Sequence, residues 1–152
     1  MESAISLTDR ILLVREIDIF SGLSVSELAA VASVTKAVSH QADQVVIREG
    51  DLGETLFLVV KGSVAVLKHL DADNELELDQ IDSGDYFGEM ALFENQKRSA
   101  SIRTLTESEF LTLHKAEFNE IVHEFPEIAL NACRVLSTRI RRLHARFTST
   151  DH

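Results

Sequence analysis

The feature that most constrains the fold of this chain is a block of short β-rich runs between residues 35 and 114. Apolar residues alternate with polar ones in these runs, or β-branched residues cluster, and turns containing Gly, Asp or Asn separate them. Short strands at such close spacing predict a small antiparallel sandwich or roll. The clearest runs are 45–48, 56–60, 63–67, 76–81, 100–104 and 109–113.

The segment before this block has the pattern of two short helices. Apolar residues recur at helical intervals over 5–16, and a second helix is predicted at 25–33. Ser24 and Glu27 have the spacing of a capping box, in which each side chain binds the main-chain N–H of the other residue. Phe20 lies in the turn between the helices, where we expect its ring to point inward.

Helical spacing returns after the block. One helix is predicted near 115–123, and a longer one begins at Pro126, because the missing N–H of proline suits the first helical position. The last helix is predicted to run to about Phe147. Its single cysteine, Cys133, cannot form an internal disulfide, and we expect it to be a small buried apolar residue.

The whole chain is expected to form one domain. Its 152 residues, 45% of them hydrophobic, suffice for one core and are too few for two full domains. The predicted fold class is α+β: a jelly-roll-like antiparallel β-roll of about eight strands with helices at both ends and a short inserted helix. The expected parts within 1–152 are N-terminal helices at 5–34, the β-roll at 35–114 and C-terminal helices at 115–147.

The charge of the chain limits its partners. A formal net charge of −10 opposes binding to nucleic acids, since such binding depends largely on Lys and Arg that neutralise phosphates. No nucleic-acid partner is therefore expected, and the chain ends at His152 without room for a helix-turn-helix. The apolar run 11–14 is far shorter than the ~20 residues of a membrane span. The short apolar run and the single cysteine together favour a cytoplasmic location. The chain would be either a whole cytoplasmic protein or the cytoplasmic part of a larger membrane protein.

One segment inside the β-rich block has a composition that suits a helix. Phe87 and Gly88 are followed by Glu89-Met90-Ala91-Leu92, which predicts a single helical turn. The start of a helix presents free N–H groups that attract anions. A few residues later come Arg98 and the small residues Ser99, Ala100 and Ser101, which allow a ligand to approach the backbone closely.

Glu89 indicates what kind of anion this segment would take. A carboxylate beside a phosphate site is repelled unless it faces a hydrogen-bond donor, and a ribose hydroxyl is such a donor. An acceptor for a sugar hydroxyl, an arginine for a phosphate and a row of main-chain donors are the three groups that a cyclic nucleotide requires.

The segment 87–101, with Phe87-Gly88-Glu89-Met90-Ala91-Leu92 followed by Arg98-Ser99-Ala100, closely resembles the phosphate-binding cassette of cyclic-nucleotide-binding domains. The glycine-marked stretches 48–59 and 60–64 resemble turns of the same family, and the likeness covers about 19–143. Within this family, the chain resembles the sensor domains of catabolite-activator proteins and of protein kinase A regulatory subunits.

The resemblance implies a role for each residue of the cassette. Glu89 would accept a hydrogen bond from the ribose 2′-hydroxyl, Arg98 would pair with the exocyclic phosphate oxygens, and main-chain amides would complete the phosphate contacts. Ser99 occurs with either base in this family, so the ligand is cAMP or cGMP, and no cofactor is expected. The candidate ligand-binding residues are Phe87, Gly88, Glu89, Met90, Ala91, Arg98, Ser99 and Ala100.

The last helix carries an apolar stripe and a run of arginines. In the family this helix commonly covers the purine and forms a hinge or dimer contact. The apolar stripe therefore has three interpretations: it packs in the core, it forms a homodimer, or it caps the base. The candidate base-capping residues are Arg139, Ile140 and Leu143. The stripe consists of Ala129, Ala132, Leu136, Ile140, Leu143 and Phe147, and the basic run of Arg139, Arg141, Arg142 and Arg146.

Two other classes of function compete with a ligand sensor. The six histidines lack the spacing of a metal site, and no Gly-x-Ser-x-Gly motif occurs, so no catalytic residue, no metal and no enzyme activity is predicted. An interaction module that keeps the fold but binds no nucleotide stays open. A sensor would act by a population shift of its last helix on an effector that the sequence leaves unidentified.

Overall fold

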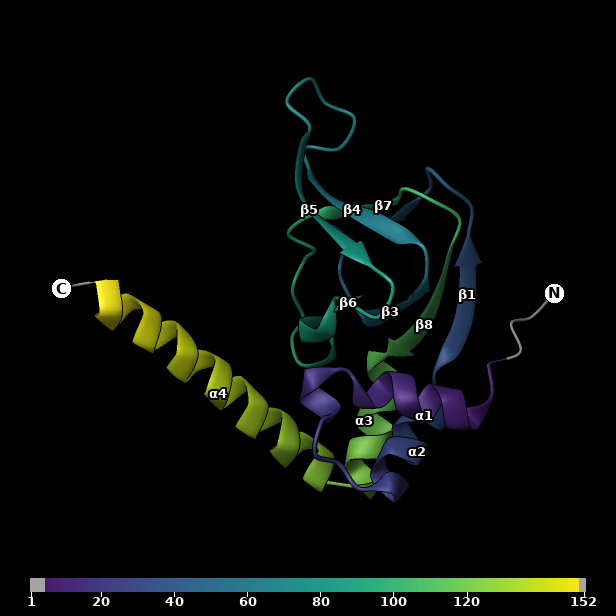
Figure 1. The fold of residues 1–152 in the computed structure, drawn as a ribbon, viewed down its shortest axis with the longest axis vertical. Helices are drawn as coiled ribbons and strands as arrows, with labels where there is room; N and C mark the ends of the chain where they lie inside the picture. Colours follow the sequence, from purple (N-terminus) through teal and green to yellow (C-terminus); the bar gives the residue numbers. More distant parts are fainter. Residues whose placement is uncertain (1–4, 151–152) are drawn as a thin grey trace.

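Two four-stranded antiparallel sheets form the middle of the computed structural model, which describes residues 5–150 (Figure 1). One sheet has the order β1-β8-β3-β6 and the other the order β2-β7-β4-β5. The strands are β1 (Lys36–His40), β2 (Val45–Ile47), β3 (Thr55–Lys61), β4 (Ser63–Lys68), β5 (Leu76–Asp82), β6 (Tyr86–Phe87), β7 (Ser101–Thr104) and β8 (Ser108–His114). The predicted α+β class with about eight strands is confirmed.

Aromatic side chains fill the space between the two sheets. Phe57 of β3 stacks on Phe87 of β6 with ring centroids 5.1 Å apart, and Phe110 of β8 meets both rings edge-on. Val64 of β4 and Ile102 of β7 close this core from the opposite sheet. The cassette begins with Phe87, so this core holds its first residue in place.

Helices close one end of the roll (Figure 1). They are α1 (Leu7–Arg15), the 3-10 turn η1 (Asp18–Phe20), α2 (Val25–Ser33), α3 (Lys115–Glu124) and α4 (Glu127–Thr150), while the 3-10 turn η2 (Glu89–Leu92) is inserted between β6 and β7. The capping box is confirmed, because the Ser24 hydroxyl accepts from the N–H of Glu27 and the Glu27 carboxylate accepts from that of Ser24. Phe20 is fully buried, as predicted.

The start of α4 is anchored and the rest of it projects from the domain (Figure 1). Ile128 and Ala132 are buried, and the Asn131 amide donates to the carbonyls of Ile19 and Ser21, each at 2.9 Å. Beyond this first part the side chains of α4 are mostly exposed. The helix therefore has one fixed end and one end that stands clear of the roll.

The prediction for Cys133 was wrong, since this side chain is exposed. Successive helical residues point about 100° apart, so the neighbour of buried Ala132 points away from the core. Strands β1 and β6 were also absent from the runs singled out above. Among the described residues, every helix is too short or too polar to cross a lipid bilayer.

Candidate functional site

The cassette forms one tight turn that is fixed by buried residues. Gly88 has a left-handed backbone (φ 81°) and starts η2, in which the N–H of Ala91 donates to the Gly88 carbonyl at 3.1 Å. Ala91 and Leu92 are buried, and Leu92 belongs to the main core. Glu89 and Met90 are consequently left on the outer side of the turn.

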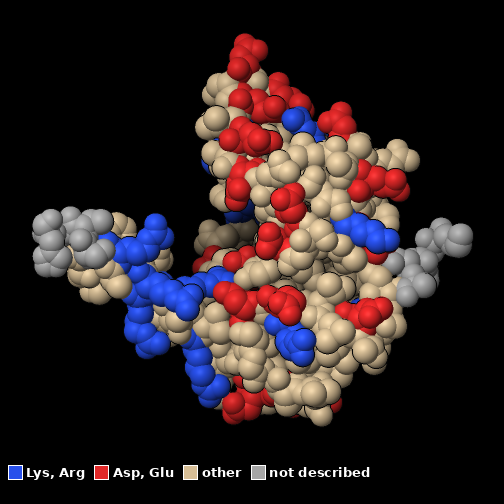
Figure 2. Space-filling model, in the orientation of Figure 1, with Lys and Arg blue, Asp and Glu red and all other residues tan. Residues whose placement is uncertain are grey.

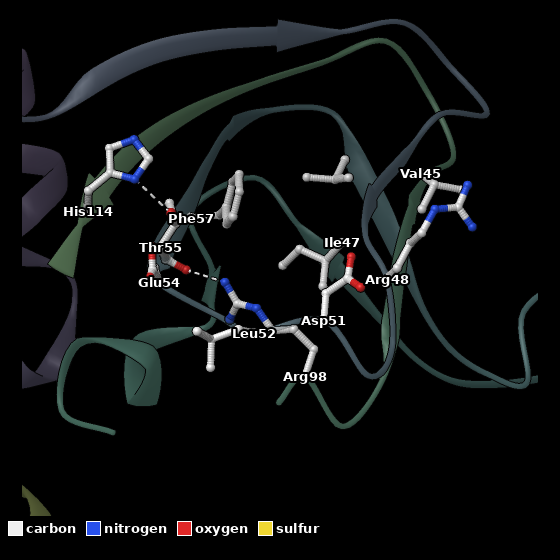
Figure 3. A pocket seen from close by; sticks show the side chains of 11 residues that line it. Val45, Ile47, Arg48, Asp51, Leu52, Glu54, Thr55, Phe57, Arg98 and His114 are labelled. Carbon is white, nitrogen blue, oxygen red and sulfur yellow. Dashed lines mark hydrogen bonds between the residues drawn. The ribbon is translucent and has the colours of Figure 1, made fainter. Parts of the chain in front are cut away.

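Arg98 lies beside this turn and reaches back to β3. Its Nη2 atom donates to the Thr55 carbonyl oxygen at 2.7 Å (Figure 3). The side chain passes so close to two glycines that a Cβ atom at Gly53 would lie 2.5 Å from its Nε atom, and one at Gly88 2.7 Å from its Nη1 atom. Both positions therefore need a residue without a side chain.

The charge of Arg98 is half-buried and has no acidic partner. Burial lowers the pKa of Arg98 below its usual value, because the charged form loses hydration. Among residues 5–150, no carboxylate forms an ion pair with it. A partly desolvated cation without a counter-charge favours an anionic ligand.

A hollow of about 580 Å³ brings together six of the eight predicted ligand-binding residues. These six are Gly88, Glu89, Met90, Ala91, Arg98 and Ser99. Phe87 is instead buried in the core between the sheets, and the half-buried Ala100 is not part of the lining. Gly53 also lines this hollow, although the sequence singled it out only as part of a turn.

A second hollow, of about 450 Å³, also reaches Arg98 (Figure 3). Val45, Ile47 and Phe57 supply its apolar wall, and His114 binds the Thr55 hydroxyl at its edge. Sequence reasoning did not connect these residues with the cassette, because they are brought together by two long-range strand pairings, β2 with β7 and β3 with β8.

Arg139 of α4 links the cassette to the N-terminal turn η1. Its guanidinium binds both oxygens of the Asp18 carboxylate, with Nη2–Oδ1 at 2.5 Å and Nε–Oδ2 at 3.0 Å. Its Nη1 atom donates to Oε1 of Glu89 at 3.2 Å. The hydroxyl of Tyr86, at the start of β6, donates to Asp18 at 2.6 Å. We call Asp18, Tyr86, Glu89 and Arg139 the Arg139 cluster.

The other two candidate capping residues are exposed. Ile140 and Leu143 are 67% and 52% exposed on the projecting part of α4. Figure 2 shows arginines along this helix and acidic side chains over the β4–β5 part of the roll. Base capping by Arg139, Ile140 and Leu143 therefore stays a prediction.

The hydrogen bonds of the Arg139 cluster shift the pKa values of its members. Burial alone raises the pKa of Asp18, but the hydrogen bonds from Arg139 and Tyr86 and the charge of Arg139 outweigh it, so that this pKa lies below its usual value. The hydrogen bond to Asp18 raises the pKa of Arg139. Burial, followed by the hydrogen bond to Asp18, raises the pKa of Tyr86 to about 12.

Tyr86 is the only tyrosine in the chain, so the near-ultraviolet absorbance of tyrosinate reports its ionisation alone. We expect a midpoint near pH 12 in the folded protein, against about 10 in the unfolded chain. Because the folded-state pKa is the higher one, the stability that this group contributes is present below pH ~10 and is lost as the pH rises toward the folded value. Circular dichroism at each pH confirms that the protein is folded.

The control for this titration is Asp18→Asn, which removes the negative charge beside the phenol. Its midpoint is expected to move from the wild-type value toward about 10. A wild-type midpoint already near 10 in the folded protein would contradict the contact between Tyr86 and Asp18.

Comparison with known proteins identifies the family of this chain. The family described as "Cyclic nucleotide-binding domain" matches residues 37–125. The chain is 36% identical over 107 residues to the cAMP-activated global transcriptional regulator Vfr of Pseudomonas aeruginosa, which covers 68% of this chain and 50% of the regulator. It is 34% identical over 117 residues to the Drosophila melanogaster cGMP-dependent protein kinase, isozyme 1, covering 75% of this chain and 15% of the kinase.

A solved structure supports the fold in particular. The N-terminal domain of a transcriptional regulator from Streptomyces coelicolor superposes with a TM-score of 0.81 at 24% identity, covering 89% of this chain and 94% of that domain. The chain spans about half the length of the bacterial regulator Vfr and a smaller share of the kinase. Because the family match includes the β-roll, the cassette and α3, this chain belongs to the cyclic nucleotide-binding domain family.

Proposed function

We propose that this domain binds cAMP or cGMP in the hollow between η2 and Arg98 and that the ligand controls an effector through α4. The observation that carries the proposal is Arg98, a half-buried cation without an acidic partner among residues 5–150, in a hollow that also contains Glu89. A cyclic phosphate would supply the missing counter-charge.

Each part of the ligand has a proposed partner. Arg98 binds the exocyclic phosphate oxygens, and the main-chain N–H groups of Gly88, Glu89, Ser99 and Ala100 complete these contacts. The start of a short helix leaves N–H groups without intrahelical acceptors, which supports this assignment. Glu89 accepts from the ribose 2′-hydroxyl. Charge-assisted hydrogen bonds of this kind contribute about 1.5–3 kcal/mol each.

The base remains open between adenine and guanine. One relative is named as cAMP-activated and the other as cGMP-dependent. Ser99 is compatible with both, since a hydroxyl there can bond a guanine and also occurs in cAMP-binding regulators. The proposed ligand class is therefore a purine 3′,5′-cyclic monophosphate.

Isothermal titration calorimetry with cAMP and with cGMP tests the proposed function. We expect micromolar or tighter affinity for at least one of the two. If neither nucleotide gives a binding heat, the domain is an interaction module that has the family fold and does not bind these ligands.

We assign the output to α4. Its anchored start and exposed far part suit a movement in which the helix closes over the purine and Ile140 and Leu143 become buried. The same exposed stripe suits a homodimer, and sedimentation velocity with and without nucleotide separates the two arrangements. The effector and the expected cytoplasmic location stay predictions.

Gly53→Ala is expected to weaken nucleotide binding roughly tenfold with little change in the free energy of unfolding. The new methyl group would lie 2.5 to 2.8 Å from three atoms of Arg98. A flexible side chain can shift to relieve this contact, so the fold persists while the guanidinium leaves its position. Calorimetry measures the affinity and urea unfolding the stability.

Gly50→Ala in the same loop is the matched control for this variant. Gly50 has a φ of +91° and no atom within 4 Å of an added Cβ. Alanine is strained there, but its methyl group would not touch the Arg98 side chain, and the hydrogen bond from the N–H of residue 50 to the Arg98 carbonyl is retained, so we expect lower stability with unchanged affinity. If both variants bind nucleotide as tightly as the wild type, the position of Arg98 does not control binding.

A further inference from the structure

The carboxylate that the proposed function assigns to the ribose already has a partner. Glu89 accepts a hydrogen bond from Arg139 at 3.2 Å, and the side chains of both residues are less than one third exposed. Arg139 of α4 joins Asp18 of η1 to Glu89 of η2, and these three elements lie far apart in the sequence. A ligand that needs Glu89 must share it with Arg139 or displace it.

We propose that Arg139 competes with the ribose 2′-hydroxyl for Glu89 and thereby couples the position of α4 to nucleotide affinity. The inference rests on the proposed function, since it presupposes that Glu89 binds the ribose. Arg139 acts through Glu89 as a positioning residue and does not itself touch the ligand.

The geometry of the Arg139 cluster separates a strong contact from a weak one. The guanidinium donates hydrogen bonds to Asp18 from two nitrogen atoms and to Glu89 from a single one. A bidentate arginine–carboxylate pair is stronger and more directional than a single contact. Asp18, held in addition by Tyr86, therefore keeps Arg139 close to Glu89, and the single contact to Glu89 is the one that a ligand can replace.

The placement of Arg139 on α4 gives this competition a consequence. Arg139 lies three turns of helix beyond the start of α4 at Glu127, past the buried Ala132. A displacement of this part of α4 moves the guanidinium away from Glu89. Because coupling between two binding events is reciprocal, a partner that holds α4 in a position where Arg139 has left Glu89 raises nucleotide affinity by the same factor by which nucleotide favours that position.

The competition predicts an unusual response to the ribose. In the wild type, the hydrogen bond from the 2′-hydroxyl is gained at the expense of the Arg139 contact, so the hydroxyl contributes little net affinity. Without Arg139, Glu89 is available and the hydroxyl contributes its full effect. Comparing cAMP and cGMP with their 2′-deoxy forms measures this contribution directly.

Arg139→Gln is the test, with the affinities for the four nucleotides measured by calorimetry. We expect the variant to bind cAMP or cGMP about threefold more tightly or better. We also expect the ratio of 2′-deoxy to ribose dissociation constants to be at least threefold larger than in the wild type. Arg139→Lys keeps a positive charge near Glu89 and should give intermediate values for both quantities.

Arg142→Gln is the matched control, because it removes the same charge from an exposed position on the same helix. It should leave both quantities unchanged, and thermal unfolding checks that each variant is folded. If both substitutions changed the affinity and the 2′-deoxy ratio equally, the cause would be the net charge of α4. This outcome would overturn the inference.

The outcomes separate this inference from the proposed function. If the wild type binds nucleotide and Arg139→Gln has the same affinity and the same 2′-deoxy ratio, the competition is refuted and the proposed function stands. If Arg139→Gln binds more weakly, Arg139 contacts the nucleotide as a base cap, which also refutes the competition. If neither wild type nor variants bind any of the four nucleotides, the proposed function itself fails.

Discussion

Replacement of Arg98 by alanine is expected to weaken cAMP or cGMP binding by at least tenfold. The guanidinium lines the hollow, with its Nη1 atom 2.7 Å from the place of a Cβ at Gly88, and it is partly desolvated before any ligand arrives. A charge-assisted bond to phosphate contributes about 1.5–3 kcal/mol, and 1.4 kcal/mol corresponds to tenfold in affinity. Calorimetry on wild type and variant measures the loss.

The stability of Arg98→Ala should change much less than its affinity. The substitution removes one hydrogen bond to the Thr55 carbonyl, but it also removes the desolvation of an unpaired charge. These two effects on the free energy of unfolding have opposite signs. An affinity loss in a normally stable protein therefore reports on the site and not on the fold.

Two controls accompany Arg98→Ala. Arg48→Ala removes an exposed cation that lines the second hollow and points away from Arg98 (Figure 3), and we expect no more than a small effect. Arg98→Lys keeps the charge but loses the two-pronged geometry, so its affinity should lie between those of wild type and alanine variant. Equal binding heats for wild type and Arg98→Ala would remove the basis of the site assignment.

Gly88→Ala is expected to have the second large effect, on both stability and binding. Gly88 has a φ of +81°, and left-handed backbone costs a residue with a Cβ roughly 1–2 kcal/mol. In addition, the new Cβ would lie 2.7 Å from Nη1 of Arg98 and 2.8 Å from the Thr55 carbonyl oxygen. The backbone oxygen cannot rotate away, so η2 must shift and carry the N–H groups of the cassette with it.

Gly84→Ala separates the backbone strain from the steric clash. Gly84 has a φ of +95°, and an added Cβ there meets no atom within 4 Å. Gly84→Ala should therefore lose stability by the strain alone and keep its nucleotide affinity. Gly88→Ala should lose more stability in urea unfolding and bind at least tenfold more weakly. Equal losses of stability in the two variants, with affinity retained, would show that the close approach at Gly88 has no bearing on the site.

Features that depend on neighbouring residues were predictable from the sequence. The capping box of Ser24 and Glu27 and the turn at 89–92 both follow from residue types a few positions apart, and both are present. The six β-rich runs correspond to strands for the same reason. The two-residue strand β6 left no such pattern, because its pairing with β3 is set by the sheet and not by its own residues.

The candidate site was predictable in its composition and not in its contacts. Gly88, Glu89, Arg98 and Ser99 were identified by type and order, and they line one hollow. The need for glycine at position 53 was not visible, because it arises from the path of the Arg98 side chain. Cys133 was assigned to the core for its helical surroundings, whereas the direction of α4 leaves it exposed.

The sequence alone thus determined where most helices and strands lie and which segment forms the cassette, and the cassette indicated the family. These features follow from local sequence because capping, strand propensity and turn formation act over a few positions. The pairing of Arg139 with Asp18 and Glu89 was decided only by the tertiary structure. Asp18 lies 121 positions and Glu89 50 positions from Arg139 in the sequence. Contacts over such separations depend on how sheets and helices pack together, and packing is set by the whole core and not by any local pattern.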